Sequence, residues 1–342
     1  MNEARHHKKE PFESETVNKT SIQKKDFNKD LQARYSFNKM LVSILSIKWG
    51  IRLFNILIKS SDGINRKGVN TEKIYIRSSS KGADIPLIIY KPVNIEGLLP
   101  IMLYFHGGAY ATGSPEFTPW IENFIFTRPC IIVAPKYRKS LTAPYPAAFN
   151  DCYDTLLWIK KFGREIGGFQ DKVILAGHSA GGGLAAAVAL KNRNDKDIDI
   201  AFQLPLYPML DYRQETESAR LYTHVPVWNT KSNKLAWDLY LRDLKEKSLA
   251  ISPYASPALN DNYADLPPAI SFVGEYEPFR DENIRYMEAL QQAGIPVRFR
   301  VFPRTYHAFD LLVPVAEVSK EAGKFLLEAY ADFYDTYCLN KG

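Results

Sequence analysis

Three side chains in this sequence have the types and the order needed for nucleophilic catalysis, and the first is Ser179. It lies in Gly177-His-Ser-Ala-Gly181, which fits a Gly-x-Ser-x-Gly pattern. Apolar residues 173–175 precede the pattern and the small residues of 184–190 follow it, which predicts a strand, a sharp turn and a helix. On such a turn the serine hydroxyl stands above the carboxyl edge of a parallel sheet. The same pattern also fits a closely packed glycine-rich turn or a phosphate cradle.

A serine hydroxyl needs a base within hydrogen-bond reach, and the base needs an orienting carboxylate. Two histidines follow Ser179 in the chain. His224 falls in a polar and aromatic stretch before further strands, whereas His307 comes just after the last predicted strand. We therefore expect His307 to be the base. His178 adjoins the serine, but neighbouring residues at a strand end point to opposite faces, so we expect its ring to point away and to be structural.

The orienting acid is expected in the loop after the strand that ends at Val273. The acidic residues of this segment are Glu275, Glu277, Asp281 and Glu282. The last two open a predicted helix, where acids commonly interact with the helix dipole. Glu277 lies in the loop itself, from which a carboxylate can reach an imidazole. Glu277 is therefore the favoured acid, and Asp281 is the alternative.

A second glycine-containing segment, His106-Gly-Gly-Ala-Tyr110, directly follows the apolar residues 101–105. Its glycines let the backbone approach a substrate closely. Backbone N–H groups fixed in a dry site can stabilise an oxyanion. The predicted oxyanion hole consists of Gly107, Gly108, Ala109 and Ala180. Alanine suits its place in this loop if its φ is negative. A plain glycine-rich turn is the other interpretation.

Strands and helices alternate along the chain, which predicts a mostly parallel sheet covered by helices on both faces, an α/β fold. Strands are expected at 73–77, 86–91, 101–105, 130–134, 173–175, 201–207, 269–273 and 297–302. Helices are expected at 149–162, 184–190, 281–293 and 315–337. We expect residues 1–35 to be a mobile polar lead and 36–65 to be N-terminal cap helices. A catalytic domain follows at 66–342, with a cap insertion at about 211–250.

The composition is that of an ordinary globular protein, with 342 residues, 46% of them hydrophobic and 24% charged. Half of the net charge of +6 comes from the first 39 residues, and the remainder is nearly balanced, which argues against a nucleic-acid partner. The cysteines, Cys130, Cys152 and Cys338, lack metal-ligand spacing and predict neither a disulfide framework nor a metal site. From this use of cysteine, a reducing cytoplasm is the simplest expectation for the location. No secretory signal is expected, because no apolar run directly follows the basic start.

Of all segments in the sequence, the apolar segment 40–58 is most like a membrane-spanning helix, but the charged residues Lys48 and Arg52 interrupt it. Its apolar residues recur at helical spacing, which predicts an amphipathic helix. Packing of this helix on the domain is the favoured interpretation. The alternative is an interfacial helix that touches lipid or guards the entrance of a pocket.

Four blocks in order resemble the hormone-sensitive-lipase-like branch of the α/β-hydrolase superfamily, the bacterial carboxylesterases with an H-G-G-G loop. The blocks are His106–Tyr110; Tyr137-Arg138 with Pro144–Ala148; Gly177–Gly182; and Glu277–Asp281 followed by Tyr306-His307. The resemblance extends from about residue 73 to the end. It implies the α/β-hydrolase fold, a nucleophile at Ser179, a base at His307, oxyanion donors at Gly108, Ala109 and Ala180, and no cofactor.

The sequence departs from the family pattern at four places. Ala109 replaces the third glycine, His178 replaces the usual Asp before the nucleophile, and Glu277 replaces the usual Asp of the acid block. The Tyr137-Arg138 block lacks its Leu-Ala-Pro-Glu continuation. The resemblance implies a serine carboxylesterase that acts on small, short-acyl esters. It implies no partner other than the substrate, and a homodimer is one possible oligomeric state. An aryl amidase or formamidase, and a non-catalytic small-molecule receptor, are the alternatives.

Overall fold

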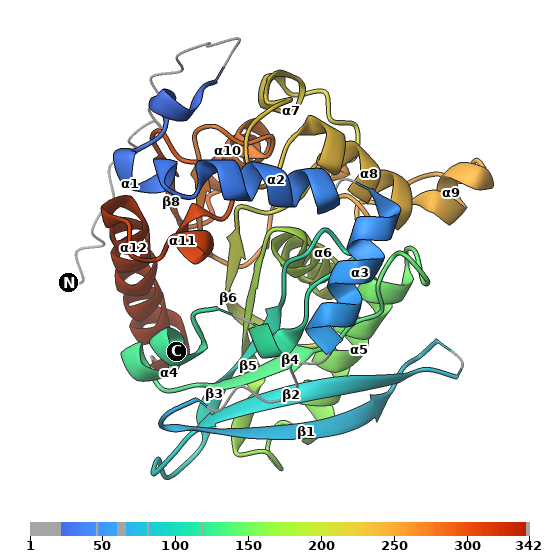
Figure 1. Ribbon diagram of the computed structural model, residues 1–342. Coiled ribbons are helices and arrows are strands. Elements are labelled where there is room, and N and C mark those ends of the chain that lie inside the picture. Colours follow the sequence, from blue (N-terminus) through green and yellow to red (C-terminus); the bar gives the residue numbers. More distant parts are fainter. Residues whose placement is uncertain (1–21, 46, 60–65, 81, 118, 340–342) are drawn as a thin grey trace.

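A computed structural model describes residues 22–339, except 46, 60–65, 81 and 118. Eight strands form one sheet in the order β1-β2-β4-β3-β5-β6-β7-β8 (Figure 1). The strands are β1 (Val69–Arg77), β2 (Asp84–Pro92), β3 (Leu99–Phe105), β4 (Ile131–Pro135), β5 (Gly168–His178), β6 (Asp199–Leu206), β7 (Ala269–Gly274) and β8 (Val297–Phe302). All eight predicted strands are present.

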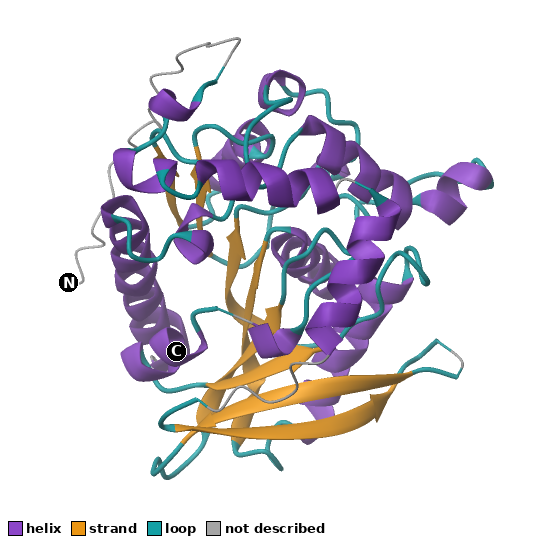
Figure 2. Ribbon diagram, in the orientation of Figure 1, coloured by secondary structure: helices purple, strands orange, loops and turns teal. Residues whose placement is uncertain are grey.

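Strands β3 to β8 pair in parallel, while β2 pairs antiparallel with both β1 and β4. Figure 2 shows the β1–β2 ribbon at one edge of the sheet, away from most of the helices. Parallel strands are buried on both faces, so alternate side chains enter two different cores. In β3, for example, Leu103 and Phe105 enter one core, and Met102 and Tyr104 enter the other.

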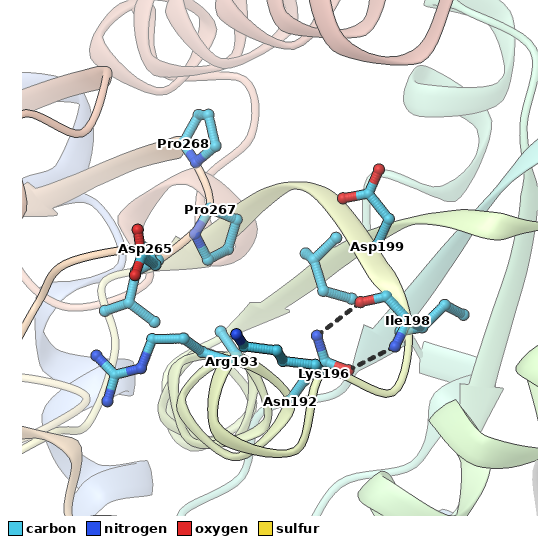
Figure 3. Close-up of a pocket in the computed structure, with 11 residues that line it drawn as sticks. Asn192, Arg193, Lys196, Ile198, Asp199, Asp265, Pro267 and Pro268 are labelled. Atoms are coloured by element: carbon cyan, nitrogen blue, oxygen red, sulfur yellow. Dashed lines mark hydrogen bonds between the residues drawn. The ribbon is translucent and has the colours of Figure 1, made fainter.

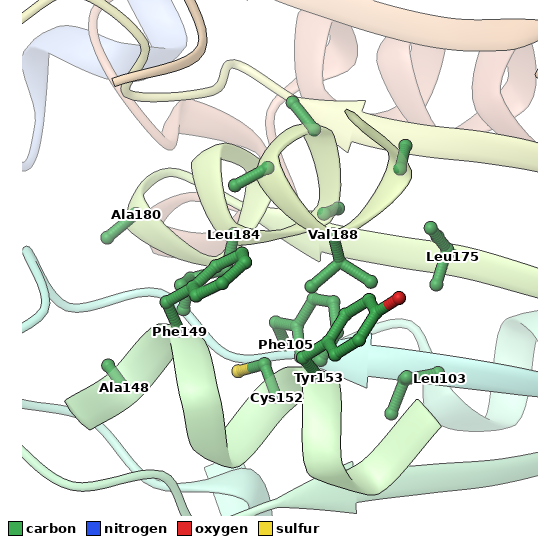
Figure 4. Packing of buried hydrophobic residues seen from close by; sticks show 14 of the residues in the cluster. Leu103, Phe105, Ala148, Phe149, Cys152, Tyr153, Leu175, Ala180, Leu184 and Val188 are labelled. Atoms are coloured by element: carbon green, nitrogen blue, oxygen red, sulfur yellow. The ribbon is translucent and has the colours of Figure 1, made fainter. Parts of the chain in front are cut away.

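Helices cover both faces of the sheet, as the alternation of elements predicts. On one face lie α5 (Ala147–Phe162), α6 (Ala180–Asp195) and α10 (Arg280–Gln292). Figure 4 shows Phe149 and Cys152 of α5 packed among Leu184 and Val188 of α6 and the side chains of β3 and β5. On the other face lie α4 (Ile121–Thr127) and α12 (Glu317–Tyr334), and the short α11 (Phe309–Leu312) precedes α12. Helix α4 was not predicted.

Five further helices lie in the segments expected to form a cap. They are α2 (Tyr35–Leu45) and α3 (Lys48–Lys59) near the start, and α7 (Glu217–Leu221), α8 (Thr230–Tyr240) and α9 (Arg242–Glu246) between β6 and β7. Ile51 of α3 packs with Leu239 of α8, so the two segments meet. Asn55 of α3 donates a hydrogen bond of 2.9 Å to the carbonyl of Ala111. The division into cap and catalytic domain stays a prediction.

The expected mobile lead at residues 1–35 is wrong for its described part, residues 22–35, and residues 1–21 lie outside the description. Helix α1 (Lys29–Gln32) follows a single 3₁₀ turn, and Phe27 and Leu31 are fully buried. Phe27 packs against Tyr306, and the Arg304 guanidinium donates to the carbonyl of Asp26. The composition of this segment is polar, but two buried apolar side chains and the hydrogen bonds with Arg304 fasten it to the domain.

Candidate active site

Strand β5 ends in a tight turn that carries Ser179 to the carboxyl edge of the sheet. Ser179 has φ 57° and ψ −123°, a conformation that costs a non-glycine residue of order 1–3 kcal/mol and must be held by its surroundings. Its N–H donates to the carbonyl of Leu206 over 2.9 Å, and its own carbonyl accepts from Gly183 and Met209. These contacts tie the strained residue to both β6 and α6.

The glycines on either side of Ser179 are required by close backbone packing. A Cβ on Gly177 would lie 2.4 Å from the carbonyl oxygen of Gly181, and one on Gly181 would lie 2.1 Å from the carbonyl oxygen of Phe105. Both neighbours are backbone atoms, which cannot move away as a side chain can. The start of α6 is therefore pressed against β3 and β5, and the serine stands at the junction.

Three predicted side chains meet at this turn, each from a different loop. The Nε2 atom of His307 lies 2.9 Å from Ser179 Oγ, and its Nδ1 atom lies 2.5 Å from Glu277 Oε2. The other carboxylate oxygen of Glu277 accepts the Gly274 N–H over 2.9 Å, which fixes this fully buried side chain. With the proton on Nδ1 directed at the carboxylate, Nε2 is free to accept the serine proton.

The imidazole of His307 is enclosed by three aromatic rings. Tyr207 and Phe279 meet it edge to face, with ring centroids 5.1 and 5.2 Å away, and Trp228 lies 6.1 Å away. Rings on several sides restrict rotation of the imidazole and exclude water from it. The enclosure therefore keeps His307 between its serine and its carboxylate.

The other candidate acids and the other downstream histidine lie elsewhere. Asp281 accepts hydrogen bonds from the Ser218 N–H and from the Arg280 guanidinium. Glu275 and Glu282 accept backbone N–H groups of Arg304 and Leu210. His224 is exposed. Among the acids of 275–282, Glu277 alone has a described contact with the imidazole of His307.

His178 points away from the Ser179 hydroxyl, in agreement with its expected structural role, and it contacts the glycine loop. Its Nε2 accepts the Gly107 N–H over 3.1 Å, and its Nδ1 lies 3.1 Å from the Tyr104 hydroxyl. Burial, together with the nearby His307, lowers the pKa of His178 to about 3. The ring is therefore neutral, which leaves Nε2 available as an acceptor. His178 fastens the loop after β3 to the end of β5.

This contact corrects one member of the predicted oxyanion hole. The Gly107 N–H is engaged by His178 and cannot also bind an oxyanion. The N–H groups of Gly108, Ala109 and Ala180 have no acceptor among the described residues. The Ala180 N–H is free because it belongs to the first residue of α6, where no helix carbonyl precedes it.

The condition under which alanine suits this place, a negative φ at Ala109, is not met. Gly108 has φ 120°, and Ala109 and Tyr110 both have φ 57°. An L-residue in this left-handed region is disfavoured by about 1–2 kcal/mol, so Ala109 occupies a position at which glycine would be relaxed. The loop adopts this conformation because contacts outside it decide its course.

Lys139 makes one of these contacts, which no sequence pattern predicts. It stands where the family pattern continues with Leu. Its Nζ lies 2.8 Å from His106 Nε2 and 2.9 Å from the carbonyl of Tyr137. The imidazole of His106 stacks on the Tyr137 ring at 4.1 Å and, through Nδ1, donates to the carbonyl of Gly107 over 2.7 Å.

The charge state of this pair follows from its enclosure. Desolvation lowers the pKa of Lys139 to about 7, and desolvation with the adjacent Lys139 lowers the pKa of His106 well below its usual value. His106 is therefore neutral and donates from Nδ1 while it accepts from Lys139. The chain Lys139–His106–Gly107 supports the loop from the side opposite His178.

A cavity of about 570 Å³ opens over Ser179 and His307. It is lined by the loop that follows β3, by the turn that carries Ser179, and by Trp228. Ile51 and Phe54 of α3 and Leu311 of α11 line it as well. No Lys, Arg, Asp or Glu occurs among the described residues that line it. Trp228 is an aromatic residue of this lining, whereas Tyr110, Trp237 and Phe309 are buried in the cores. The cavity suits an uncharged, mostly apolar ligand.

A larger cavity of about 700 Å³ lies at the far end of α6, shown in Figure 3. Its lining combines Arg193 and Lys196 with Asp199 and Asp265. The side chain of Asn192 exchanges two hydrogen bonds with the backbone of Ile198 there, which joins α6 to β6. Its lining contains no hydroxyl paired with a base, so we place the chemistry in the cavity over Ser179.

Comparison with known proteins shows which family this chain belongs to. Residues 102–311 match a family described as having the alpha/beta hydrolase fold. Esterase LipI of Mycobacterium tuberculosis is 32% identical over 224 residues, which cover 65% of this chain and 69% of LipI. An arylesterase of Saccharolobus solfataricus is 30% identical over 236 residues, covering 66% of this chain and 73% of the arylesterase. The solved structure of a bacterial heroin esterase matches with a TM-score of 0.80 at 27% identity, covering 90% of this chain and 98% of its own.

The chain therefore belongs to the hormone-sensitive-lipase-like family of α/β hydrolases. The predicted α/β-hydrolase fold is confirmed. The relatives are named as esterases, and hydrolysis of carboxylic esters is the activity that these findings support for this chain.

Proposed function

We propose that this protein is a serine carboxylesterase in which Ser179, His307 and Glu277 form the catalytic triad, and that it hydrolyses small, uncharged, short-acyl esters. One observation carries the proposal: His307 bridges Ser179 Oγ and the buried Glu277 through its two ring nitrogens, at 2.9 and 2.5 Å. The three unpaired N–H groups of Gly108, Ala109 and Ala180 supply the oxyanion hole. The cytoplasmic location stays a prediction.

The reaction begins with attack of Ser179 Oγ on the ester carbonyl carbon while His307 Nε2 takes the hydroxyl proton. Glu277 orients the ring and stabilises the imidazolium. The oxyanion receives hydrogen bonds from the three backbone N–H groups, which are fixed before the charge develops. The bond to the alkoxy oxygen then breaks, and His307 protonates the departing alcohol.

The second half of the reaction restores the enzyme. Water attacks the acyl carbon on Ser179, and His307 accepts a proton from that water. The tetrahedral intermediate collapses, the bond to Ser179 breaks, and the proton returns to the serine oxygen. A carboxylic acid is released. The protein's own side chains and backbone supply every proton transfer and every charge-stabilising contact in this sequence.

The substrate class follows from the cavity lining. An apolar lining without Lys, Arg, Asp or Glu gives a charged substrate no partner, and transfer of an unpaired charge from water is strongly unfavourable. Neutral acetate and butyrate esters are therefore expected to be better substrates than esters of dicarboxylic acids or of quaternary amines.

The test compares wild type with Ser179→Ala on p-nitrophenyl acetate and butyrate. We expect the substitution to lower kcat/KM by at least about 10³-fold, because the remaining groups only bind and polarise the ester. A fluorophosphonate should add to the wild type at Ser179 and not to the variant, as read by peptide mass spectrometry. Equal turnover by both proteins, or labelling at another residue, would exclude this mechanism. Faster turnover of matched aryl formamides would favour the amidase alternative.

A further inference from the structure

The outer faces of α2 and α3 carry an unusual density of exposed apolar side chains. Trp49, Leu53 and Ile56 lie at i, i+4 and i+7 on the solvent side of α3, and Trp49 and Ile56 are 67% and 65% exposed. Phe37 and Met40 of α2 are more than half exposed, and Ile47 lies between the helices. Figure 1 shows α2 and α3 as successive helices on the outside of the molecule. These six residues define the apolar face of the two helices, which is exposed in the part of the chain that the structure describes.

The inner face of α3 accounts for its packing without this outer stripe. Ile51 is buried against α8, Asn55 donates to the carbonyl of Ala111, and Phe54 lines the cavity over Ser179. Among the described side chains of α3, those at 51, 54 and 55 face the rest of the domain. Trp49, Leu53 and Ile56 are instead exposed to solvent, although exposing large apolar side chains is unfavourable.

The charges on this face have one sign. Residues 31–61 contain five basic residues and no Asp or Glu. Lys39, Lys48 and Arg52 are exposed, and no described acid forms an ion pair with any of them. A second copy of the chain placed on this face would bring two sets of cations together. An anionic lipid surface would neutralise the cations and bury the apolar stripe at once.

We propose that the outer face of α2 and α3 is a docking surface for an anionic lipid bilayer, on which the helices lie in the interface plane. Tryptophan, large aliphatic side chains and basic residues on one helical face are the features that bind such surfaces. No described helix is long and apolar enough to span a membrane. Because Phe54 and Ile51 line the cavity on the other side of α3, docking would bring that cavity close to lipid-dissolved molecules.

Vesicle partitioning of the full chain tests the proposal without relying on esterase activity. Vesicles of 70% phosphatidylcholine and 30% phosphatidylserine are compared with phosphatidylcholine alone by flotation. We expect about 100-fold stronger partitioning onto the anionic vesicles, because each basic residue near such a surface contributes about fivefold. The preference should weaken in 0.5 M salt, where charges are screened.

Two triple variants isolate the surface. Trp49→Ser/Leu53→Ser/Ile56→Ser should lower partitioning by at least about 100-fold, since three large apolar side chains no longer enter the interface. Phe126→Ser/Leu249→Ser/Val315→Ser changes comparably exposed apolar residues elsewhere and should leave it unchanged. Both variants should keep the wild-type thermal unfolding midpoint and hydrolysis of dissolved p-nitrophenyl butyrate, which shows that the surface was altered without loss of the fold.

Several results would overturn the proposal. One is failure of the wild type to float with anionic vesicles, and another is equal partitioning of the wild type and the α3 variant. A third is a homodimer, measured by light scattering, that the α3 variant dissociates while the wild type leaves vesicles unbound. That outcome would assign the face to a second copy of the chain.

Discussion

The elbow at 177–181 and the loop at 106–110 both present backbone N–H groups at the carboxyl edge of the sheet, but different contacts hold them there. In the elbow, the backbones of β3, β5 and α6 are so close that Gly177 and Gly181 have no room for a side chain. In the loop, side-chain contacts fix the course of the backbone. His178 from the end of β5 accepts the Gly107 N–H, and His106 of the loop itself, supported by Lys139, binds the Gly107 carbonyl.

The difference affects how each region can fail. The backbone segments of the elbow pack too closely to admit an added side chain, so a substitution of its glycines should destabilise the whole domain. The loop is held by a few polar contacts, so removal of one should shift its N–H groups and lower activity, with a smaller loss of stability than a substitution in the elbow. Variants of both regions can separate these two behaviours.

The largest effect is expected from Gly181→Ala. Its Cβ would lie 2.1 Å from the Phe105 carbonyl oxygen and 2.5 Å from that of His106, so α6 must move away from the sheet. We expect a loss of about 3 kcal/mol or more in the free energy of unfolding, measured by urea denaturation. Gly182→Ala is the control in the same helix, where the nearest atom would be 3.0 Å away and alanine favours the helix. Equal losses in both variants would contradict the packing argument.

The next effect is expected from His178→Ala. The substitution leaves the Gly107 N–H without its acceptor, which costs about 1–3 kcal/mol of stability and frees the loop to move. We expect kcat on p-nitrophenyl butyrate to fall by about 10- to 100-fold with little change in KM, because the oxyanion hole acts on the transition state.

His178→Asp is the matched variant, because aspartate is the family's usual residue here and can accept the same N–H. It should restore most of kcat. His224→Ala, at an exposed histidine, should leave both kinetic constants unchanged. If the aspartate variant were as slow as the alanine variant, the role assigned to the Gly107 contact would be wrong.

Replacement of Lys139 should change the pH dependence of stability. Desolvation depresses its pKa to about 7 in the folded chain, against about 10.4 when unfolded. Between these values the unfolded chain binds more protons, so this group makes stability rise with pH from about 7 towards 10. One such group raises the free energy of unfolding by at most about 1.4 kcal/mol per pH unit. The rise is smaller here because the Lys139 side chain is partly exposed to solvent.

The Lys139→Met variant should therefore lack this rise of stability with pH. The measurement is the free energy of unfolding of variant and wild type, obtained by urea denaturation at pH 6, 7, 8 and 9. Lys139→Arg should lack the rise too, because arginine keeps its proton over this range. The methionine variant also leaves His106 Nε2 without a donor, so we expect a fewfold lower kcat. Parallel stability curves for wild type and Lys139→Met would contradict the depressed pKa.

The sequence was sufficient for those parts of the site that depend on chain order. Ser179, Glu277 and His307 each follow a strand of a parallel sheet, and carboxyl ends of such strands meet at one edge, so their approach could be predicted. The loop could not be predicted in the same way. Gly107 was misassigned because its acceptor is a side chain from another strand, and no local pattern indicates that Lys139 reaches His106.

The fold shows the same division. All eight strands follow from apolar runs, whereas α4 carries no strong periodicity and the segment 22–35 was misjudged from its polar composition. Phe27 and Leu31 are too few to form a periodic pattern in the sequence, yet both are fully buried, and Phe27 packs against Tyr306 in the β8–α11 loop. Contacts of this kind are properties of the assembled surface.

The smallest effect, and the one that most directly contrasts the two regions, is a pair of alanine-to-glycine changes. Ala109 has φ 57°, so Ala109→Gly relieves about 1–2 kcal/mol of strain, against about 0.5–1 kcal/mol of added entropy in the unfolded chain. Ala180 begins α6, so glycine at this position relieves no backbone strain. The lower helix propensity of glycine costs up to about 1 kcal/mol of stability there. We expect Ala109→Gly to raise the urea midpoint slightly and Ala180→Gly to lower it. Changes of the same sign would show that the left-handed backbone of the loop is not strained by its alanine.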